Sequence, residues 1–278
     1  MAIKKKTTEK DATPQEVKTE VVSAPKAASE KEDTMPISLV QKLMSEMEEK
    51  LSNKFHSQIN KLKLQKQKEE AISQSNIHYH QGATHINERN YHKAIEELQL
   101  SLDILPKRAG AYIDLSACKY EIKDYDGAMS DIEKAFDLDL ADDSLDKMDM
   151  WARAQNRARA YYMRALIKTN FGDKDGALDD YTKCLGIDEE DFDARNNRAI
   201  IYSDKREYDL AINDFNYIID FDEANVIERF GDSKNFVEAR ANAYYGRAFL
   251  NKRFNNFTLA VKDYEKVIEL DPNDIDSI

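Results

Sequence analysis

The chain is poor in the residues that build tight turns and disulfide frameworks. Its 278 residues include eight glycines, five prolines and two cysteines. So little glycine and proline leaves little turn material, which favours an all-helical fold. Cys118 and Cys184 fall at packing positions of expected helices, so we expect buried free thiols and no disulfide.

The sequence also lacks the segments that cross a membrane or direct export. No run of about 20 apolar residues occurs in it. The amino terminus is polar and rich in lysine, without the apolar core of a signal peptide. We therefore expect a cytoplasmic protein without direct membrane insertion.

Motifs for catalysis and cofactor binding are missing as well. There is no phosphate-binding glycine loop and no persuasive set of nucleophile, base and acid. His78 and His85 are about two helical turns apart, which is too far for them to share a metal ion on one helix. The sequence therefore predicts no enzyme activity, no cofactor and no metal site.

Acidic residues outnumber basic ones, and the excess lies in one part of the chain. The net charge is −12, and because residues 1–75 sum to +2, residues 76–278 hold −14. An acidic surface disfavours a nucleic acid as partner and permits basic peptides.

What the chain does contain is one helical hairpin repeated five times. A small residue marks each copy, and successive copies lie 34, 49, 34 and 49 residues apart, so two intervals hold 15 extra residues. A fixed period of this length is typical of solenoids, in which each unit buries one face against its neighbour. The five small residues are Ala94, Ala128, Ala177, Ala211 and Ala260.

The positions around each alanine agree in type. A second small residue twelve positions earlier lets the paired helices approach closely, and a bulky residue four positions later fills the space between hairpins. Three positions before the alanine, four copies have an aromatic residue and the third has Lys174. The second small residues are Gly82, Ser116, Ala165, Ala199 and Ala248, and the bulky ones are Leu98, Ile132, Tyr181, Phe215 and Tyr264.

This pattern resembles the tetratricopeptide repeat (TPR), a 34-residue hairpin with small residues at positions 8 and 20, aromatic residues at 17 and 24, and a proline at 32. Pro106 and Pro272 occupy the proline position in the first and fifth copies, and other residues occupy it in the middle three. The resemblance covers about residues 75–274. It implies an all-α fold, an α-solenoid of five TPR-like helical hairpins preceded by a long amphipathic helix.

The expected organisation has three parts. Residues 1–35 contain almost no large apolar residue and form a disordered tail, residues 36–74 form an amphipathic or coiled-coil helix, and residues 75–278 form the solenoid. Its units are 75–108, 109–142, 158–191, 192–225 and 241–274, with insertions at 143–157 and 226–240. We expect the first insertion to be helical from Ser144, and the second to be a loop that becomes helical after Ser233.

In the TPR family the first helix of each hairpin lines a concave groove, and the resemblance places positions 2, 5, 9, 12 and 13 in it. Positions 5 and 9 are mostly apolar or aromatic here, which suits a helix or extended segment of a protein partner. The groove residues expected to bind that partner are Tyr79, Ile113, Tyr162, Leu166, Ile200, Tyr245 and Phe249. Tyr79 and Ala83 replace the lysine and asparagine with which one subgroup of the family grips a peptide's carboxyl terminus, so we do not expect that mode of recognition.

A stripe of apolar residues follows the helix expected over residues 36–74. Its members recur about every 3.67 residues, the period of a straight or slightly right-handed seam. They are Val40, Met44, Met47, Leu51, Phe55, Ile59 and Leu62. Such a helix is not stable alone in water, so it associates with a copy of itself, docks on the repeats or binds a different protein.

The last hairpin offers a second surface for self-association. Solenoids usually close with a capping helix, and the four residues that follow Asp274 are too few to form one. We therefore expect partial exposure of four residues in its second helix, namely Val261, Tyr264, Val267 and Ile268.

Together these features predict a cytoplasmic scaffold or adaptor that binds a segment of a partner protein in the concave groove and can form a homo-oligomer. Two alternatives remain open. One is a chaperone for a secretion or filament subunit, and the other is a structural component of a large motility or cell-envelope assembly.

Overall fold

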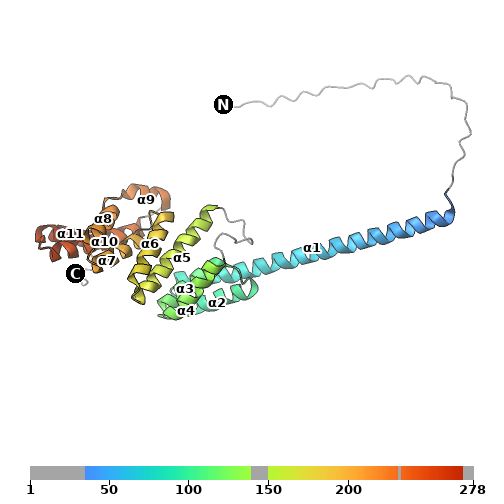
Figure 1. The fold of residues 1–278 in the computed structure, drawn as a ribbon, viewed down its shortest axis with the longest axis horizontal. Helices are drawn as coiled ribbons and strands as arrows, with labels where there is room; N and C mark the ends of the chain where they lie inside the picture. The colour runs from blue at the N-terminus through green and yellow to red at the C-terminus, as the bar shows by residue number, and fades with distance from the viewer. Residues whose placement is uncertain (1–34, 139–149, 231–232, 272–278) are drawn as a thin grey trace, which may run out of the picture. The chain divides into compact units, whose positions relative to one another are not determined.

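The computed structural model describes residues 35–138, 150–230 and 233–271, and for residues 150–153, 229 and 230 it describes the backbone alone. Residues 1–34 of the tail and residues 143–149 of the first insertion lie outside these ranges. Every regular element within them is an α-helix (Figure 1). The expected all-α solenoid is confirmed.

The first helix, α1, spans Ile37–Asn87 without a break. It joins the amphipathic helix expected over residues 36–74 to the first helix of unit one, so the expected boundary lies inside a single element. The reason is local, because no glycine or proline occurs between Pro36 and Gly82 to end the helix. By its internal contacts the chain divides into two compact units, Met1–Asn60 and Lys61–Ile278.

The repeats are built from helical pairs. The last part of α1 pairs with α2, and the following pairs are α3 with α4, α5 with α6, α7 with α8, and α10 with α11 (Figure 1). Their bounds are α2 Tyr91–Ile104, α3 Ala109–Glu121, α4 Tyr125–Asp137, α5 Met150–Asn170, α6 Lys174–Ile187, α7 Phe192–Asp204, α8 Tyr208–Asp220, α10 Lys234–Arg253 and α11 Phe257–Leu270.

Each hairpin turns at the fifteenth position of its unit, where the backbone is left-handed. The angle φ is 57° at Arg89, 66° at Lys123, 79° at Gly172, 65° at Arg206 and 62° at Asn255. Only glycine adopts this conformation without a steric cost. Because four larger residues adopt it at the same position, the packing of the two helices sets the turn.

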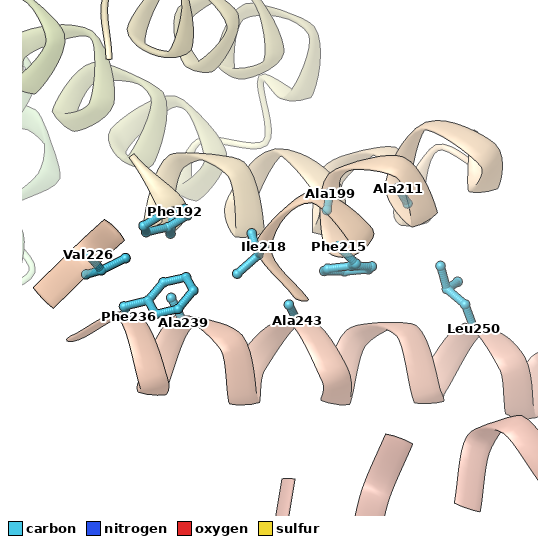
Figure 2. Packing of buried hydrophobic residues seen from close by; sticks show 10 residues of the cluster. All are labelled: Phe192, Ala199, Ala211, Phe215, Ile218, Val226, Phe236, Ala239, Ala243 and Leu250. Atoms are coloured by element: carbon cyan, nitrogen blue, oxygen red, sulfur yellow. The ribbon is translucent and has the colours of Figure 1, made fainter. Parts of the chain in front are cut away.

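The repeat alanines lie where helices approach most closely, and all five are buried. Figure 2 shows how a bulky residue fills the space beside them, with Phe215 of α8 lying between Ala199 of α7 and Ala243 of α10. The fit is tight, because a Cβ atom added to Gly246 would lie 2.3 Å from the Phe215 ring. The small and bulky positions of the repeat therefore pack as the sequence predicts.

A carboxylate three positions after each repeat alanine ties the helices of its hairpin together, a feature that the sequence analysis did not identify. In unit three, Asp180 accepts hydrogen bonds from Arg164 at 2.8 and 2.7 Å and from Lys168 at 2.7 Å. In unit five, Asp263 accepts from Arg247 at 3.0 and 2.7 Å. The five carboxylates belong to Glu97, Asp131, Asp180, Asp214 and Asp263.

Part of the second insertion is helical where the sequence predicts a loop. Residues Glu223–Phe230 form α9. Val226 of α9 is buried against Phe192, Phe236 and Ala239 (Figure 2), and this contact stabilises a helix too short to persist alone. Helix α10 then begins directly after Ser233, as expected.

The first insertion is described from Met150 onward. Helix α5 begins at Met150, eight residues before the expected start of unit three, and is therefore extended by about two turns within the described ranges. The earlier extension expected from Ser144 lies outside them.

Candidate protein-binding groove

Four of the expected groove residues surround one hollow. It has a volume of about 490 Å³ and is lined by residues of α5, α7 and α10, the first helices of units three, four and five. The four are Tyr162, Ile200, Tyr245 and Phe249. Ile200, Tyr245 and Phe249 are 52, 39 and 50% exposed, so each presents a large apolar surface to solvent.

The other three expected groove residues do not line this hollow. Ile113 is fully buried and packs with Ala128, Ile132 and Ala160, so it is a core residue and not a partner contact. Helix α5 packs on α3 and covers this position. Leu166 is half-buried and contributes to the packing of units two and three.

Tyr79 is half-buried and hydrogen-bonded within the protein. Its hydroxyl pairs with the carboxylate of Asp114, and Arg159 donates a second hydrogen bond to that carboxylate. Burial and the charge of Asp114 both raise the pKa of Tyr79. These three residues link units one, two and three, so the polar end of Tyr79 has an internal role.

Asn196 holds two helices of the hollow together. Its side-chain amide donates a hydrogen bond of 2.8 Å to the carbonyl oxygen of Ala239, which joins α7 to α10. Asn196 is almost completely buried, and this fixed contact sets the separation of the two helices.

The hollow also contains polar residues, of which the sequence analysis had considered only Asn196, at position 5 of unit four. They are Asp193, Asn196, Asn197, Ser203, Asp204 and Asn242. Asp193 and Asp204 stand at positions 2 and 13 of unit four, so extending the inspection of groove positions beyond 5 and 9 would have found them. Every charged residue that lines the hollow is acidic.

The electrostatic environment of Asp193 is unfavourable to its negative charge. The walls of the hollow reduce the hydration of its carboxylate, and the carboxylates of Asp191 and Glu238 repel it, so the pKa of Asp193 lies above its ordinary value. Asp204 differs, because the ammonium group of Lys174 lies 2.8 Å from its carboxylate. A cation bound beside Asp193 would relieve the repulsion.

The residues expected to mediate self-association differ in exposure. All seven members of the α1 stripe are exposed, from 38% for Val40 to 70% for Met47. On α11, Val261 and Ile268 are exposed, and Tyr264 is half-buried with its ring 5.9 Å from that of Tyr245. Val267 is buried, so the expectation that it is partly uncovered is wrong.

The comparisons with known proteins identify the repeat. The family model described as tetratricopeptide repeat matches residues 158–191 and 241–274. The chain therefore contains tetratricopeptide repeats. The matched ranges coincide with the bounds given to units three and five by the sequence, and these TPR units supply Tyr162, Tyr245 and Phe249 to the hollow.

Solved structures with a similar fold include two of the protein MamA. A double mutant of MamA RS-1 has a TM-score of 0.50 and 13% identity over 73% of this chain and 97% of that one. MamA 41-end from Desulfovibrio magneticus RS-1 has a TM-score of 0.50 and 12% identity over 72% of this chain and 96% of that one. At this identity the similarity concerns the fold alone.

No curated protein matches the chain significantly. Within the described ranges, none of the helices combines the length and the apolar character needed to span a bilayer.

Proposed function

We propose that this TPR protein is an interaction scaffold and that units three to five bind a segment of a partner protein in the hollow between α5, α7 and α10. The observation that supports this is the exposure of Ile200, Tyr245 and Phe249 around one concave surface. Burial of such side chains by a partner removes apolar area from water, and aromatic anchors supply much of the energy of an interface.

The charges of the hollow favour a basic partner segment. Asp193 and Asp204 line it together with the apolar side chains, and the raised pKa of Asp193 marks a carboxylate that a cation would stabilise. An amphipathic helix or extended segment with lysine or arginine beside its apolar residues would satisfy both features.

In this proposal the protein acts by holding its partner and performs no catalytic step, as is general for TPR modules. We place this function in the cytoplasm. The buried free thiols of Cys118 and Cys184 are compatible with that reducing compartment.

The test begins with a partner captured by the full chain from its source cells and then purified. Titration of that partner compares the wild-type protein with the double variant Tyr245→Ser/Phe249→Ser. Loss of two anchors should weaken binding by about 2 kcal/mol or more, roughly 30-fold, while far-ultraviolet circular dichroism stays unchanged. Tyr162 is unsuitable for the test because it packs against the buried Tyr181 and its loss would disturb the core.

A matched control removes two aromatic side chains outside the hollow. Phe171 and Phe257 are 51 and 59% exposed, and neither lines the hollow. Phe171→Ser/Phe257→Ser should leave the affinity within about twofold of wild type. Equal losses in the two double variants, or none in either, would place the binding surface elsewhere.

A separate variant tests the expected charge of the partner. The change Asp193→Asn should lower the affinity for a basic partner segment, because one attractive charge is removed. It should also reduce the salt dependence of that affinity. An affinity that rises in Asp193→Asn would show that the bound segment is acidic.

A further inference from the structure

The amino-terminal half of α1 has an apolar seam that nothing covers in the described part of the chain. The stripe from Val40 to Leu62 extends over 22 residues, about 33 Å along the helix axis. A hollow of about 460 Å³ lies on it, lined by Met44, Met47, Glu48, Lys50, Leu51 and Lys54. Apolar side chains surrounding a hollow on a helix surface form the type of hole that accepts a side chain from a facing helix.

The exposed seam requires a partner for thermodynamic reasons. A single helix in water gains little from hydrogen bonding beyond what the solvent offers, so most helical stability comes from the packing of an apolar face. Large side chains such as Met47 and Leu51 are 70 and 57% exposed, and their burial would be favourable.

The charges beside the seam are arranged with opposite signs on its two edges. Glu48 precedes Leu51 by three residues and Lys54 follows it by three, so at 100° per residue they lie about 60° to either side of Leu51. Lys50 lies on the same edge as Lys54. One edge of the seam is therefore acidic and the other basic at its centre.

This arrangement is self-complementary in one orientation only. When two parallel helices are related by a twofold axis along the seam, the acidic edge of each faces the basic edge of the other, and Glu48 lies beside Lys50 and Lys54 of the second copy. In an antiparallel pair, edges of the same charge meet. This arrangement brings four lysines together on one side of the pair and two glutamates together on the other. Like charges at this distance oppose association.

We infer that the occupant of the seam is a second copy of this chain, and that the two α1 helices pair parallel and in register. The pairing buries the stripe of both copies and pairs Glu48 of each copy with Lys50 and Lys54 of the other at the centre of the seam. The dimer contains two copies of the repeat array, and the inference does not depend on the groove proposed above.

The first experiment measures mass. Sedimentation equilibrium of the full chain should give the mass of two chains at micromolar concentration. Met47→Glu/Leu51→Glu should give the mass of one chain, because four charges would be buried in the seam. The control variant Asn53→Glu changes the opposite side of the helix, and its measured mass should remain that of two chains. A single-chain mass for the wild-type protein at 100 μM, or a mass unaffected by Met47→Glu/Leu51→Glu, would overturn the inference.

The second experiment measures orientation with variants that retain the seam. Val40→Cys should form an interchain disulfide on mild oxidation, since residue 40 of one copy faces residue 40 of the other in a parallel pair. The native cysteines are buried and do not compete. A disulfide that forms only when Val40→Cys is mixed with Leu62→Cys would show antiparallel pairing and overturn the parallel arrangement.

The third experiment tests the charged edges. The change Glu48→Lys should raise the dissociation constant of the dimer about fivefold. Adding Lys50→Glu and Lys54→Glu to the same chain should return the dissociation constant to the wild-type value. Equal dimer affinities in the wild type, the single variant and the triple variant would contradict the argument from charge.

Discussion

The buried carboxylate of Asp180 gives the sharpest test of how the hairpins hold together. Its side chain is completely buried and receives hydrogen bonds from Arg164 and Lys168 on the facing helix. The change Asp180→Asn keeps the shape and nearly the volume of the side chain, so it opens no cavity. It removes the negative charge and turns one acceptor oxygen into a donor that faces two cations.

The expected loss is about 2–4 kcal/mol. Removing one partner from a buried ion pair costs roughly 3–5 kcal/mol because the remaining charge is left uncompensated. The cost is lower here because the side chains of Arg164 and Lys168 are 22 and 23% exposed and regain some hydration. With a denaturant slope of about 2 kcal/mol/M, the midpoint of urea unfolding should fall by roughly 1–2 M.

The neighbouring residue provides a matched control. Asp179 forms an ion pair with Lys183 in which both side chains are largely exposed. Asp179→Asn removes the same charge from the same helix, and an exposed pair of this type contributes less than about 0.5 kcal/mol. The midpoint of Asp179→Asn should therefore stay close to that of the wild type.

The pH dependence should identify the ion pair as the cause. Burial raises the pKa of Asp180, but the hydrogen bonds from Arg164 and Lys168 outweigh it and leave the pKa below its ordinary value. A lowered pKa in the folded state gives stability that is present above the unfolded-state pKa of about 3.9 and disappears as the pH falls through the folded-state pKa. The difference between wild type and Asp180→Asn should be constant from pH 5 to 8 and shrink below about pH 4. A difference unchanged at pH 3, or an equal loss in Asp179→Asn, would refute the reasoning.

Two further outcomes follow from the packing. Gly246→Ala should destabilise the protein by about 1–3 kcal/mol, because the new Cβ would lie 2.3 Å from the Phe215 ring. The control Gly186→Ala places its Cβ where nothing lies within 4 Å, so it should be neutral or should stabilise the protein by up to about 1 kcal/mol. Thermal unfolding measures the stability of both variants, and a Gly246→Ala protein more stable than the Gly186→Ala protein would contradict the packing described here. Cys118 and Cys184 should resist a thiol reagent at pH 8 until urea unfolds the chain, because burial raises the pKa of Cys118 to about 12 and also raises that of Cys184. Rapid labelling of the folded protein would contradict their burial.

The repeat could be predicted because close helix packing leaves a local signature. Only a side chain as small as that of Ala128 or Ala211 allows two helices to approach at that point, and both positions are completely buried. The ion pairs of the hairpins could also be predicted from the sequence, because an acidic residue stands three positions after every repeat alanine. The signal is present at the same period as the alanines, but the acidic residues entered the sequence analysis only through their net charge.

The groove could be predicted only in part, because equivalent positions are covered to different degrees. Ile113 and Tyr245 both stand at position 5 of their units, yet Ile113 is fully buried and Tyr245 is 39% exposed. Helix α5 covers Ile113, whereas Tyr245 faces the hollow. A position within the repeat fixes which way a side chain points from its own helix, and the neighbouring units decide what it meets.

The sequence by itself determined the pairing of helices into five hairpins and the small and bulky positions between them, since these depend on contacts within about 34 residues. The tertiary structure alone decided which apolar residues surround an open hollow, that Val226 is buried enough to hold α9 together, and that Asp193 lies among other carboxylates. These properties depend on how residues distant in sequence shield one another from water, and a periodic pattern contains no information about that shielding.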